Sequence, residues 1–324
     1  MSMTRRALLA GSAAVAGTSV FVGPAPAAAA PIGAKDQAPG YYRYKLGDAR
    51  LTAVNDGIWN RPIDKTFVRN APFAEVRRTM ERAFMPSRAA LPVPITGLVV
   101  DAGGKRVLID TGSAGQIVDT AGTLNENLVS AGITAQSIDI ILISHFHPDH
   151  IDNIKTKDNG RVFPNAEIKV SAAEWAYWMD DTHLRAAPAE KKMYFLNARR
   201  IFADIAQEVT RFAPGEVAPG ITAIAAPGHT PGHTAFAVTS GRQSMLVLSD
   251  TSFHPALFVR HPDWQLVWDV DPALAVKTRR RLLDRAAADR MLVQGYHFPF
   301  PAVGHIVRTA DAYDFVPELW QATL

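Results

Sequence analysis

The chain has 324 residues, of which 34 are lysine or arginine and 31 are aspartate or glutamate, giving a formal net charge of +3. Hydrophobic residues make up 48% and charged residues 20%, as in a globular protein that buries a large core. Cysteine is absent, which excludes disulfides, thiolate metal ligands and a cysteine nucleophile, so a metal site must use His, Asp and Glu. The arginine-rich stretches have helical patterning, and we interpret them as solvated helix faces, with no nucleic-acid partner.

The first 30 residues differ in composition from the rest of the chain. Thr4-Arg5-Arg6 precedes an apolar run, Ala7–Val22, and small residues follow up to Ala30. This order is typical of a secretory signal peptide, and the paired arginines favour the twin-arginine route, which exports folded proteins. The alternative is a membrane anchor, for which the run is short and weakly apolar. We predict a signal peptide over residues 1–30, a periplasmic or secreted location, and no membrane contact after cleavage.

The pattern of apolar residues predicts strands and helices along the rest of the chain. In chain order they are strand 51–54, helix 73–83, strands 95–100 and 106–109, helix 123–131, strands 138–143 and 167–170, helices 172–179 and 189–206, strands 208–211, 221–225, 234–238 and 245–248, helix 272–287 and strand 291–294. Strands alternate with helices, but hairpins also occur. This mixture predicts an α/β (α+β) fold, with mixed sheets between helical layers and a single domain over residues 31–324.

The densest cluster of candidate metal ligands directly follows the buried strand 138–143. Its sequence is His145-Phe146-His147-Pro148-Asp149-His150. Residues i and i+2 at a strand end point to the same side, so His145 and His147 can bind one ion. The turn that follows brings Asp149 and His150 to the other side. Imidazole and carboxylate are the zinc ligands available without cysteine, so this cluster predicts a metal site.

Other strand ends carry the same residue types. Pro227-Gly228-His229-Thr230-Pro231-Gly232-His233 follows strand 221–225, Asp250 follows strand 245–248, and His297 follows strand 291–294. Functional groups of layered α/β folds gather outside strand ends. We therefore expect these side chains to converge on the cluster after strand 138–143.

This ordered set, preceded by Asp110-Thr111-Gly112, resembles the metallo-β-lactamase superfamily over about residues 50–310. The resemblance implies an αββα sandwich, with two central sheets and helices outside. It also implies two metal ions and seven ligands: His145, His147 and His233 for the first ion, Asp149, His150 and His297 for the second, and Asp250 for both. Asp110 matches a supporting residue near the site.

Two of these ligands compete with a neighbouring histidine. His233 is chosen because it directly precedes the next strand, which makes His229 a supporting residue. His297 is chosen because it lies at a strand end, whereas His305 follows Phe298-Pro299-Phe300-Pro301.

The expected cofactors are two divalent metal ions, with zinc first and manganese, cobalt or iron as alternatives. Two ions bridged by a carboxylate lower the pKa of a water molecule between them and so provide hydroxide as the nucleophile. In this interpretation Asp250 and Asp149 are the catalytic carboxylates that hold the ions, and no Ser or Cys nucleophile is needed.

The substrate is the least constrained part of the analysis. Quorum-signal lactonases of the superfamily commonly have Tyr three residues after the bridging Asp, where this chain has Phe253. The stretch Tyr296–Pro301 and Asp263-Trp264-Gln265 are similar to the branch that contains methyl parathion hydrolase and related esterase-lactonases. That resemblance implies a small-molecule substrate, an aromatic pocket and a homodimer. Candidate pocket residues are Phe253, His254, Trp175, Trp178 and Phe195, the last three being core aromatics in the alternative interpretation.

We therefore expect hydrolysis of lactones or aryl esters, with organophosphate triesters as main or side substrates. The first alternative is an acyl-homoserine lactone hydrolase, which would quench quorum signals. The second is a periplasmic binding protein that kept the fold and lost catalysis.

Overall fold

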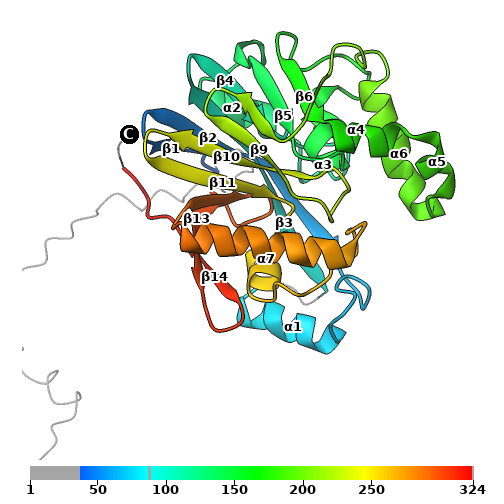
Figure 1. Cartoon of the computed structure of the whole chain (residues 1–324), viewed down its shortest axis with the longest axis vertical. Coiled ribbons are helices and arrows are strands. Elements are labelled where there is room, and N and C mark those ends of the chain that lie inside the picture. The colour runs from blue at the N-terminus through cyan, green and yellow to red at the C-terminus, as the bar shows by residue number, and fades with distance from the viewer. Residues whose placement is uncertain (1–36, 87–88, 323–324) are drawn as a thin grey trace, which may run out of the picture. The chain divides into compact units, whose positions relative to one another are not determined.

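Two seven-stranded β-sheets pack face to face in the computed structural model, which describes residues 37–86 and 89–322 (Figure 1). The predicted signal peptide lies outside the described residues. Pro39–Leu324 form one compact unit. Among the described residues, no helix has the length and apolar character needed to cross a membrane.

The first sheet is built from the N-terminal half of the chain. Its strands, in spatial as well as chain order, are β1 (Tyr41–Leu46), β2 (Ala49–Pro62), β3 (Ala90–Ala102), β4 (Lys105–Ile109), β5 (Ile140–Ile143), β6 (Glu167–Ser171) and β7 (Thr210–Phe212). The strands β1 to β4 pair antiparallel, and β4 to β7 pair parallel. The sheet is therefore mixed.

The second sheet comes from the C-terminal half. Its strands are β8 (Gly215–Ala218), β9 (Ile221–Ala225), β10 (Thr234–Ser240), β11 (Gln243–Ser249), β12 (Leu292–Gly295), β13 (Val303–Arg308) and β14 (Tyr313–Pro317). Here too each strand lies next to the strand that follows it in the chain, from β8 to β14, and only β11 and β12 pair parallel. The expectation of two mixed sheets is confirmed.

Helices cover the outer face of each sheet (Figure 1). The helices are α1 (Phe73–Arg82), α2 (Leu124–Ser130), α3 (Pro148–Ile151), α4 (Ala172–Met179), α5 (Asp181–Ala186), α6 (Ala189–Phe202) and α7 (Pro272–Ala288), with two short 3-10 helices, η2 (Ala135–Ser137) and η3 (Asp152–Ile154), and a short π-helix, η4 (Pro255–Val259). Trp178 of α4 and Phe202 of α6 pack on the first sheet, and Leu282 of α7 packs on the second. The predicted αββα layering is confirmed.

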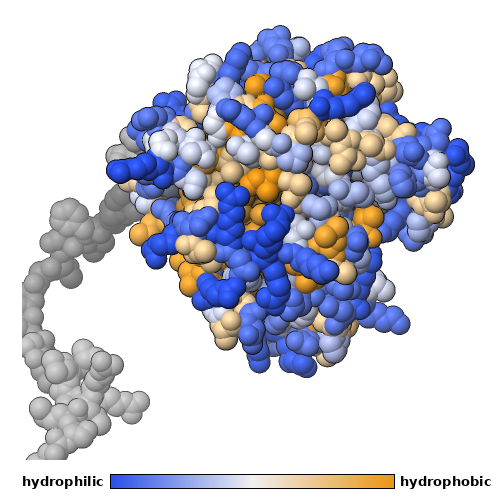
Figure 2. All heavy atoms as spheres, viewed as in Figure 1, coloured by the Kyte–Doolittle hydropathy of each residue, from blue (hydrophilic) through white to orange (hydrophobic). Residues whose placement is uncertain are grey.

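The apolar core between the sheets takes side chains from both of them, for example Leu51 and Leu98 from the first and Phe236 and Val247 from the second. The outer side of α7, in contrast, is hydrophilic. Figure 2 shows hydrophilic side chains gathered over this helix. Arg280 of α7 is partly exposed and pairs with Asp263. The interpretation of the arginine-rich stretches as solvated faces holds for Arg280 but is wrong for Arg279, which is buried.

The structure extends the strand predicted at 51–54. The prediction ended this strand at Val54, but β2 continues through Asn55-Asp56-Gly57 to Pro62, and its pairing with β3 shifts register between Asn55 and Gly57. Such a bulge leaves one residue out of the ladder, here Asp56. Its buried carboxylate accepts hydrogen bonds from the backbone and hydroxyl of Ser113 and from the backbone N–H of Leu124. A turn-like sequence therefore fixes a buried polar contact inside a long strand.

Candidate metal centre

The candidate ligands are carried by loops at the ends of four strands, three of which pair parallel with a neighbour. The cluster 145–150 follows β5, His229 follows β9, Asp250 follows β11 and His297 follows β12. Because both sheets end at this edge, residues far apart in sequence meet there.

A first group of side chains consists of His145, His147, His229 and Asp250, whose ligand atoms lie within 4.8 Å of one another. Nδ1 of His147 lies 3.0 Å from Nε2 of His145 and 3.0 Å from Nε2 of His229. Oδ2 of Asp250 lies 3.4 Å from Nε2 of His229. Three imidazole nitrogens and one carboxylate oxygen thus face a common point, as in a four-coordinate metal site.

A second group lies on the other side of Asp250 and consists of Asp149, His150 and His297. Oδ1 of Asp250 lies 3.3 Å from Nε2 of His150 and 3.3 Å from Nε2 of His297. Oδ2 of Asp149 lies 3.6 Å and 3.4 Å from the same two nitrogens. One oxygen of Asp250 therefore faces each group, which is the geometry of a carboxylate that bridges two ions.

The choice of His233 over His229 needs correction. His229 belongs to the first group, whereas Nε2 of His233 accepts a hydrogen bond from the backbone N–H of Asp250 at 3.2 Å. The physical reason lies in the loop: His233 directly precedes β10, so its ring lies beside the backbone of the sheet, while His229 lies farther out on the loop. Burial lowers the pKa of His233 to about 3, which keeps it a neutral acceptor.

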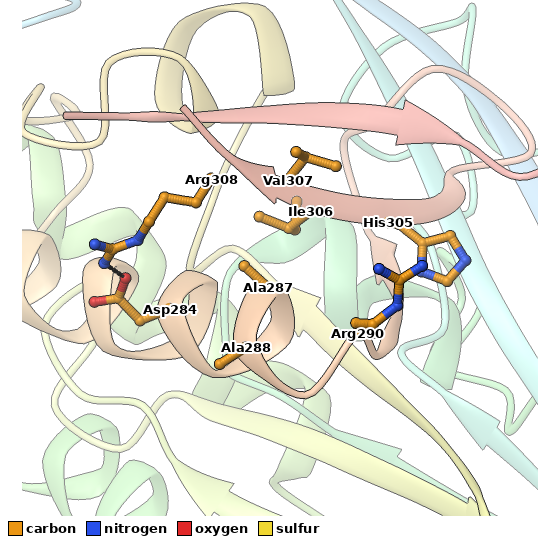
Figure 3. Close-up of a pocket in the computed structure, with 8 residues that line it drawn as sticks. All are labelled: Asp284, Ala287, Ala288, Arg290, His305, Ile306, Val307 and Arg308. Carbon is orange, nitrogen blue, oxygen red and sulfur yellow. Dashed lines mark hydrogen bonds and ion pairs between the residues drawn. The ribbon is translucent and has the colours of Figure 1, made fainter. Parts of the chain in front are cut away.

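The choice between His297 and His305 agrees with the structure. His305 lies on β13, where its Nε2 is 3.2 Å from the carboxylate of Glu318. Figure 3 shows it beside Arg290 at one end of a cavity of about 440 Å³ between α7 and β13. Arg308 pairs with Asp284 at the other end. None of the residues that line this cavity belongs to the two ligand groups.

The two groups fit divalent metal ions. Nε2 of His150, Nε2 of His297 and Oδ1 of Asp250 are buried and have no hydrogen-bond partner among the described residues. Such buried, unpartnered atoms are costly unless something else binds them. Burial lowers the pKa of His145 and of His147 well below the usual range, so both are neutral, which is the form that binds metals. Nitrogen and carboxylate ligands suit zinc, manganese, cobalt or iron.

Hydrogen bonds fix the orientation of the rings of His150 and His297. Nδ1 of His150 lies 2.9 Å from Oδ2 of Asp110, which also accepts from the hydroxyl of Ser144. Nδ1 of His297 donates to the backbone carbonyl of Pro94 at 2.7 Å. These contacts set the ring tautomers so that the other nitrogen faces the centre. The supporting role expected of Asp110 agrees with its position.

Sequence reasoning missed the partner of His229. Oδ1 of Asp269 lies 2.9 Å from Nδ1 of His229, and its Oδ2 accepts from the backbone N–H of Leu266. Asp269 is fully buried beside Arg279, which donates to the backbone carbonyls of Thr251, Pro262 and Trp264. Helix α7 thereby anchors the loop that holds a ligand in place. No motif marks Asp269, because it lies in an irregular loop.

Glu174 was also missed. This carboxylate at the start of α4 is buried and accepts four hydrogen bonds: from Phe146 N at 2.9 Å, Trp178 Nε1 at 2.6 Å, Thr230 Oγ1 at 2.7 Å and Gly232 N at 2.9 Å. It therefore ties the loop of His145 and His147 to the loop of His229. A Cβ on Gly232 would lie 2.0 Å from the backbone nitrogen of Glu174, so only glycine permits this close approach.

Comparison with known proteins identifies the family. A sequence model of the metallo-beta-lactamase superfamily matches residues 91–297. The chain belongs to this superfamily. The structure is similar to that of the hydrolase AbOPH, with 27% identity, a TM-score of 0.82, and coverage of 88% of this chain and 99% of that one. It is equally similar to AidC, a dizinc quorum-quenching lactonase in complex with the product N-hexanoyl-L-homoserine, with 27% identity, a TM-score of 0.82 and coverage of 87% and 98%. A probable metal-dependent hydrolase from Staphylococcus aureus shares the fold at 19% identity and a TM-score of 0.70, with coverage of 86% and 100%.

These findings show that the protein is a hydrolase of the metallo-beta-lactamase superfamily with a His/Asp site for divalent metal ions. The hydrolase and lactonase neighbours are consistent with the esterase-lactonase branch that the sequence indicated.

A cavity of about 710 Å³ lies directly over this superfamily metal site. His147, Asp149 and Asp250 line its inner end. The remaining walls are mostly aromatic and aliphatic, with two arginines: Trp59, Arg61, Gln116, Ile117, Pro148, Asp152, Met193, Tyr194, Leu196, Asn197, Arg200, Phe253 and Trp268. A small, largely apolar molecule could therefore reach the ligands.

Only one of the five predicted pocket residues lines this cavity, namely Phe253. Trp178 and Phe195 are buried in the core against the first sheet, and Trp175 packs on Phe146 and Phe202. His254 is buried, and burial lowers its pKa to about 3. The prediction was wrong for the three aromatic residues because the apolar pattern of α4 and α6 does not show which face meets the sheet, and wrong for His254 because this side chain is buried. The aromatic residues that do line the cavity are Trp59 of β2, Tyr194 of α6, Phe253 of the loop after β11 and Trp268 of the loop before α7.

Proposed function

We propose that the protein cleaves lactones and aryl esters with two metal ions, and that aryl phosphotriesters are further substrates. The observation that carries this proposal is the position of Asp250. Its two oxygens face different ligand groups, and it lies at the inner end of an apolar cavity. A metal centre of this kind suits lactones, aryl esters and phosphotriesters, because each has one oxygen that a metal ion can polarise and another that leaves.

Two divalent ions bound there would lower the pKa of a water molecule and polarise the substrate's carbonyl or phosphoryl oxygen. The side chains of the protein position the ligand groups and exclude water. Asp250 and Asp149 fix the distance between the ligand groups, and the aromatic walls exclude bulk water from the reacting carbonyl. No serine or cysteine nucleophile is required.

The substrate class follows from what the cavity offers. Trp59, Trp268 and Phe253 provide aromatic surface for an aryl or acyl group, and the rings of Phe253 and Trp268 lie 5.3 Å apart. Phenoxides leave more readily than alkoxides, so aryl esters and aryl lactones should be the better substrates.

A second candidate, acyl-homoserine lactone hydrolysis, is favoured by one observation. AidC, which is 27% identical over most of both chains, is a lactonase with a bound homoserine product. Phe253 argues against this candidate, because it stands where quorum-signal lactonases commonly have Tyr and its ring cannot donate a hydrogen bond to a homoserine lactone.

The test is a substrate panel on mature protein loaded with zinc, manganese or cobalt. It compares dihydrocoumarin, p-nitrophenyl acetate, N-hexanoyl-homoserine lactone and paraoxon, with Asp250→Asn as the inactive control. The proposal predicts the highest kcat/KM on the aryl substrates and detectable turnover of paraoxon. Faster hydrolysis of the homoserine lactone would replace it with the second candidate, and hydrolysis of none of the four would refute both.

We further propose that the protein is exported through the twin-arginine route and is a homodimer. The support for export is the segment from Thr4 to Ala30. Replacing Arg5 and Arg6 together by lysine should trap the precursor inside the cell, and normal export of that variant would exclude the route. Light scattering of the mature protein tests the dimer, and a monomeric mass would exclude it.

A further inference from the structure

Helix α6 forms one wall of the cavity over the metal centre. Met193, Leu196 and Arg200 lie at helical spacing along this wall, and Tyr194 lies at its inner end. The ring of Tyr194 packs on the ring of His147 with 5.3 Å between centroids. Its phenol is therefore placed next to a ligand of the first group.

The surroundings of the hydroxyl leave its proton free. A phenol has a pKa of about 10, so Tyr194 carries its proton at neutral pH. Its oxygen has a hydrogen bond with Trp268. The indole N–H of Trp268 can only donate, so the phenol oxygen accepts that bond. The O–H proton is not used by Trp268 and can be donated into the cavity.

Three other polar side chains of the cavity bond to protein groups. Gln116 donates to the backbone carbonyls of Asp152 and Lys155. Asn197 donates to the carboxylate of Asp152, and Arg200 donates to Gln116 and Asn197. These residues form a network among themselves along the outer wall.

Phe253 lines the same cavity, with its ring 4.3 Å from that of His297, but carries no hydroxyl. A hydrogen bond to substrate from that side is excluded. Tyr194 reaches the cavity from a different element, α6, and near the other ligand group. The chain thus combines an apolar contact at Phe253 with a phenol at Tyr194.

We propose that the Tyr194 hydroxyl donates a hydrogen bond to the leaving oxygen of the substrate during hydrolysis. The proposal rests on the ester and lactone hydrolysis proposed above. In that reaction the oxygen of a water molecule bonds to the carbonyl carbon, and the bond from this carbon to the leaving oxygen breaks. The electron pair stays on the leaving oxygen, which takes up a proton from the water, while Tyr194 keeps its own. The phenol stabilises the negative charge that develops on the leaving oxygen.

If Tyr194 has this role, the loss of kcat/KM on removing its hydroxyl depends on the leaving group of the substrate. An alkoxide carries more charge in the transition state than a nitrophenoxide, whose ring already delocalises it. Tyr194→Phe keeps the packing on His147 and removes only the hydroxyl. We expect a loss in kcat/KM of about 10- to 100-fold on an aliphatic δ-lactone, the range for a hydrogen bond to a charged group. The loss on p-nitrophenyl acetate should be under about 3-fold.

The experiment measures kcat/KM for wild type and Tyr194→Phe across p-nitrophenyl, phenyl and alkyl esters and the δ-lactone. Tyr177→Phe is the matched control, because Tyr177 lies on α4 against Phe195 and does not line the cavity. Metal content is measured for each variant. The ratio between substrates within one variant does not depend on the active fraction, so partial misfolding or metal loss cannot mimic the result.

A deficit of Tyr194→Phe that grows from the nitrophenyl ester to the lactone, with no such trend for Tyr177→Phe, supports the proposal. An equal deficit on all substrates, or none, overturns it and leaves the proposed function intact. If wild type hydrolyses no ester or lactone, both the function and the role of Tyr194 fail.

Discussion

Oδ1 of Asp269 lies 2.9 Å from Nδ1 of His229, and this contact decides which histidine of the segment 227–233 belongs to the metal centre. The carboxylate holds the ring so that Nε2 faces His147. His233, four residues later, instead accepts from the backbone of Asp250. The two histidines therefore make a natural pair of test positions.

His229→Ala should lose one ion per chain and reduce ester hydrolysis by at least about 100-fold, since a ligand is removed. His233→Ala should keep both ions, because its ring does not face either ligand group, although the vacated space lowers thermal stability. Metal analysis and kinetics of the two purified variants provide the check. Loss of an ion in His233→Ala alone would restore the assignment made from the sequence.

Asp269→Asn keeps the shape of the side chain but removes its charge. We expect the affinity of the first site to fall by about 10- to 100-fold, the usual effect of losing a carboxylate behind a ligand histidine. Asp263→Asn is the matched control, because Asp263 also pairs with an arginine of α7 but is exposed. Chelator competition measures both affinities. Equal effects of the two substitutions would mean that the contact with His229 is not the cause.

Glu174→Gln tests the connection between the two ligand loops. Glutamine presents an NH2 group to at least one of the donors that Glu174 accepts from, for example the backbone N–H of Gly232. An unsatisfied buried donor costs about 1–3 kcal/mol, so the free energy of unfolding should fall by that amount. Glu190→Gln, at an exposed position on α6, is the control. Denaturant unfolding that is unchanged in both variants would contradict this role.

Asp56 should make stability depend on pH. Burial raises its pKa to about 6, whereas an unfolded chain has a value of about 3.9. Because the folded pKa is the higher one, the folded state is favoured fully below the unfolded value and loses stability as pH rises through about 6. Asp56→Asn lacks this dependence. Between pH 4 and 7 the free energy of unfolding of wild type should fall relative to that of the variant by about 2 kcal/mol. Parallel pH profiles would show that Asp56 does not titrate in this range.

The sequence was sufficient for most of the metal centre, because the ligands sit directly after apolar strands and strand ends meet at one edge. It was not sufficient for His229, whose partner Asp269 lies in a loop that no pattern places. The prediction of the aromatic pocket residues was wrong for a similar reason. Trp59 lies in the part of β2 beyond the predicted strand 51–54, and Trp268 lies in an irregular loop, so their contact depends on tertiary packing.

Among the helices and strands, too, those with a local sequence pattern were predicted and those that depend on tertiary pairing were not. Helix α4 has the predicted bounds, 172–179, since its apolar pattern is local. The strands β13 and β14 were not predicted, because they follow a proline-rich stretch and pair with each other and with β12 rather than showing a strong pattern of their own.

The central claim is that two ions, bridged by Asp250, carry out hydrolysis. The most direct test titrates metal-free mature protein with zinc and follows both bound metal per chain and hydrolysis of p-nitrophenyl acetate. Activity should rise to its maximum only as the second equivalent binds, and Asp250→Asn should bind less metal and remain inactive. Full activity with one ion or none per chain would contradict the claim.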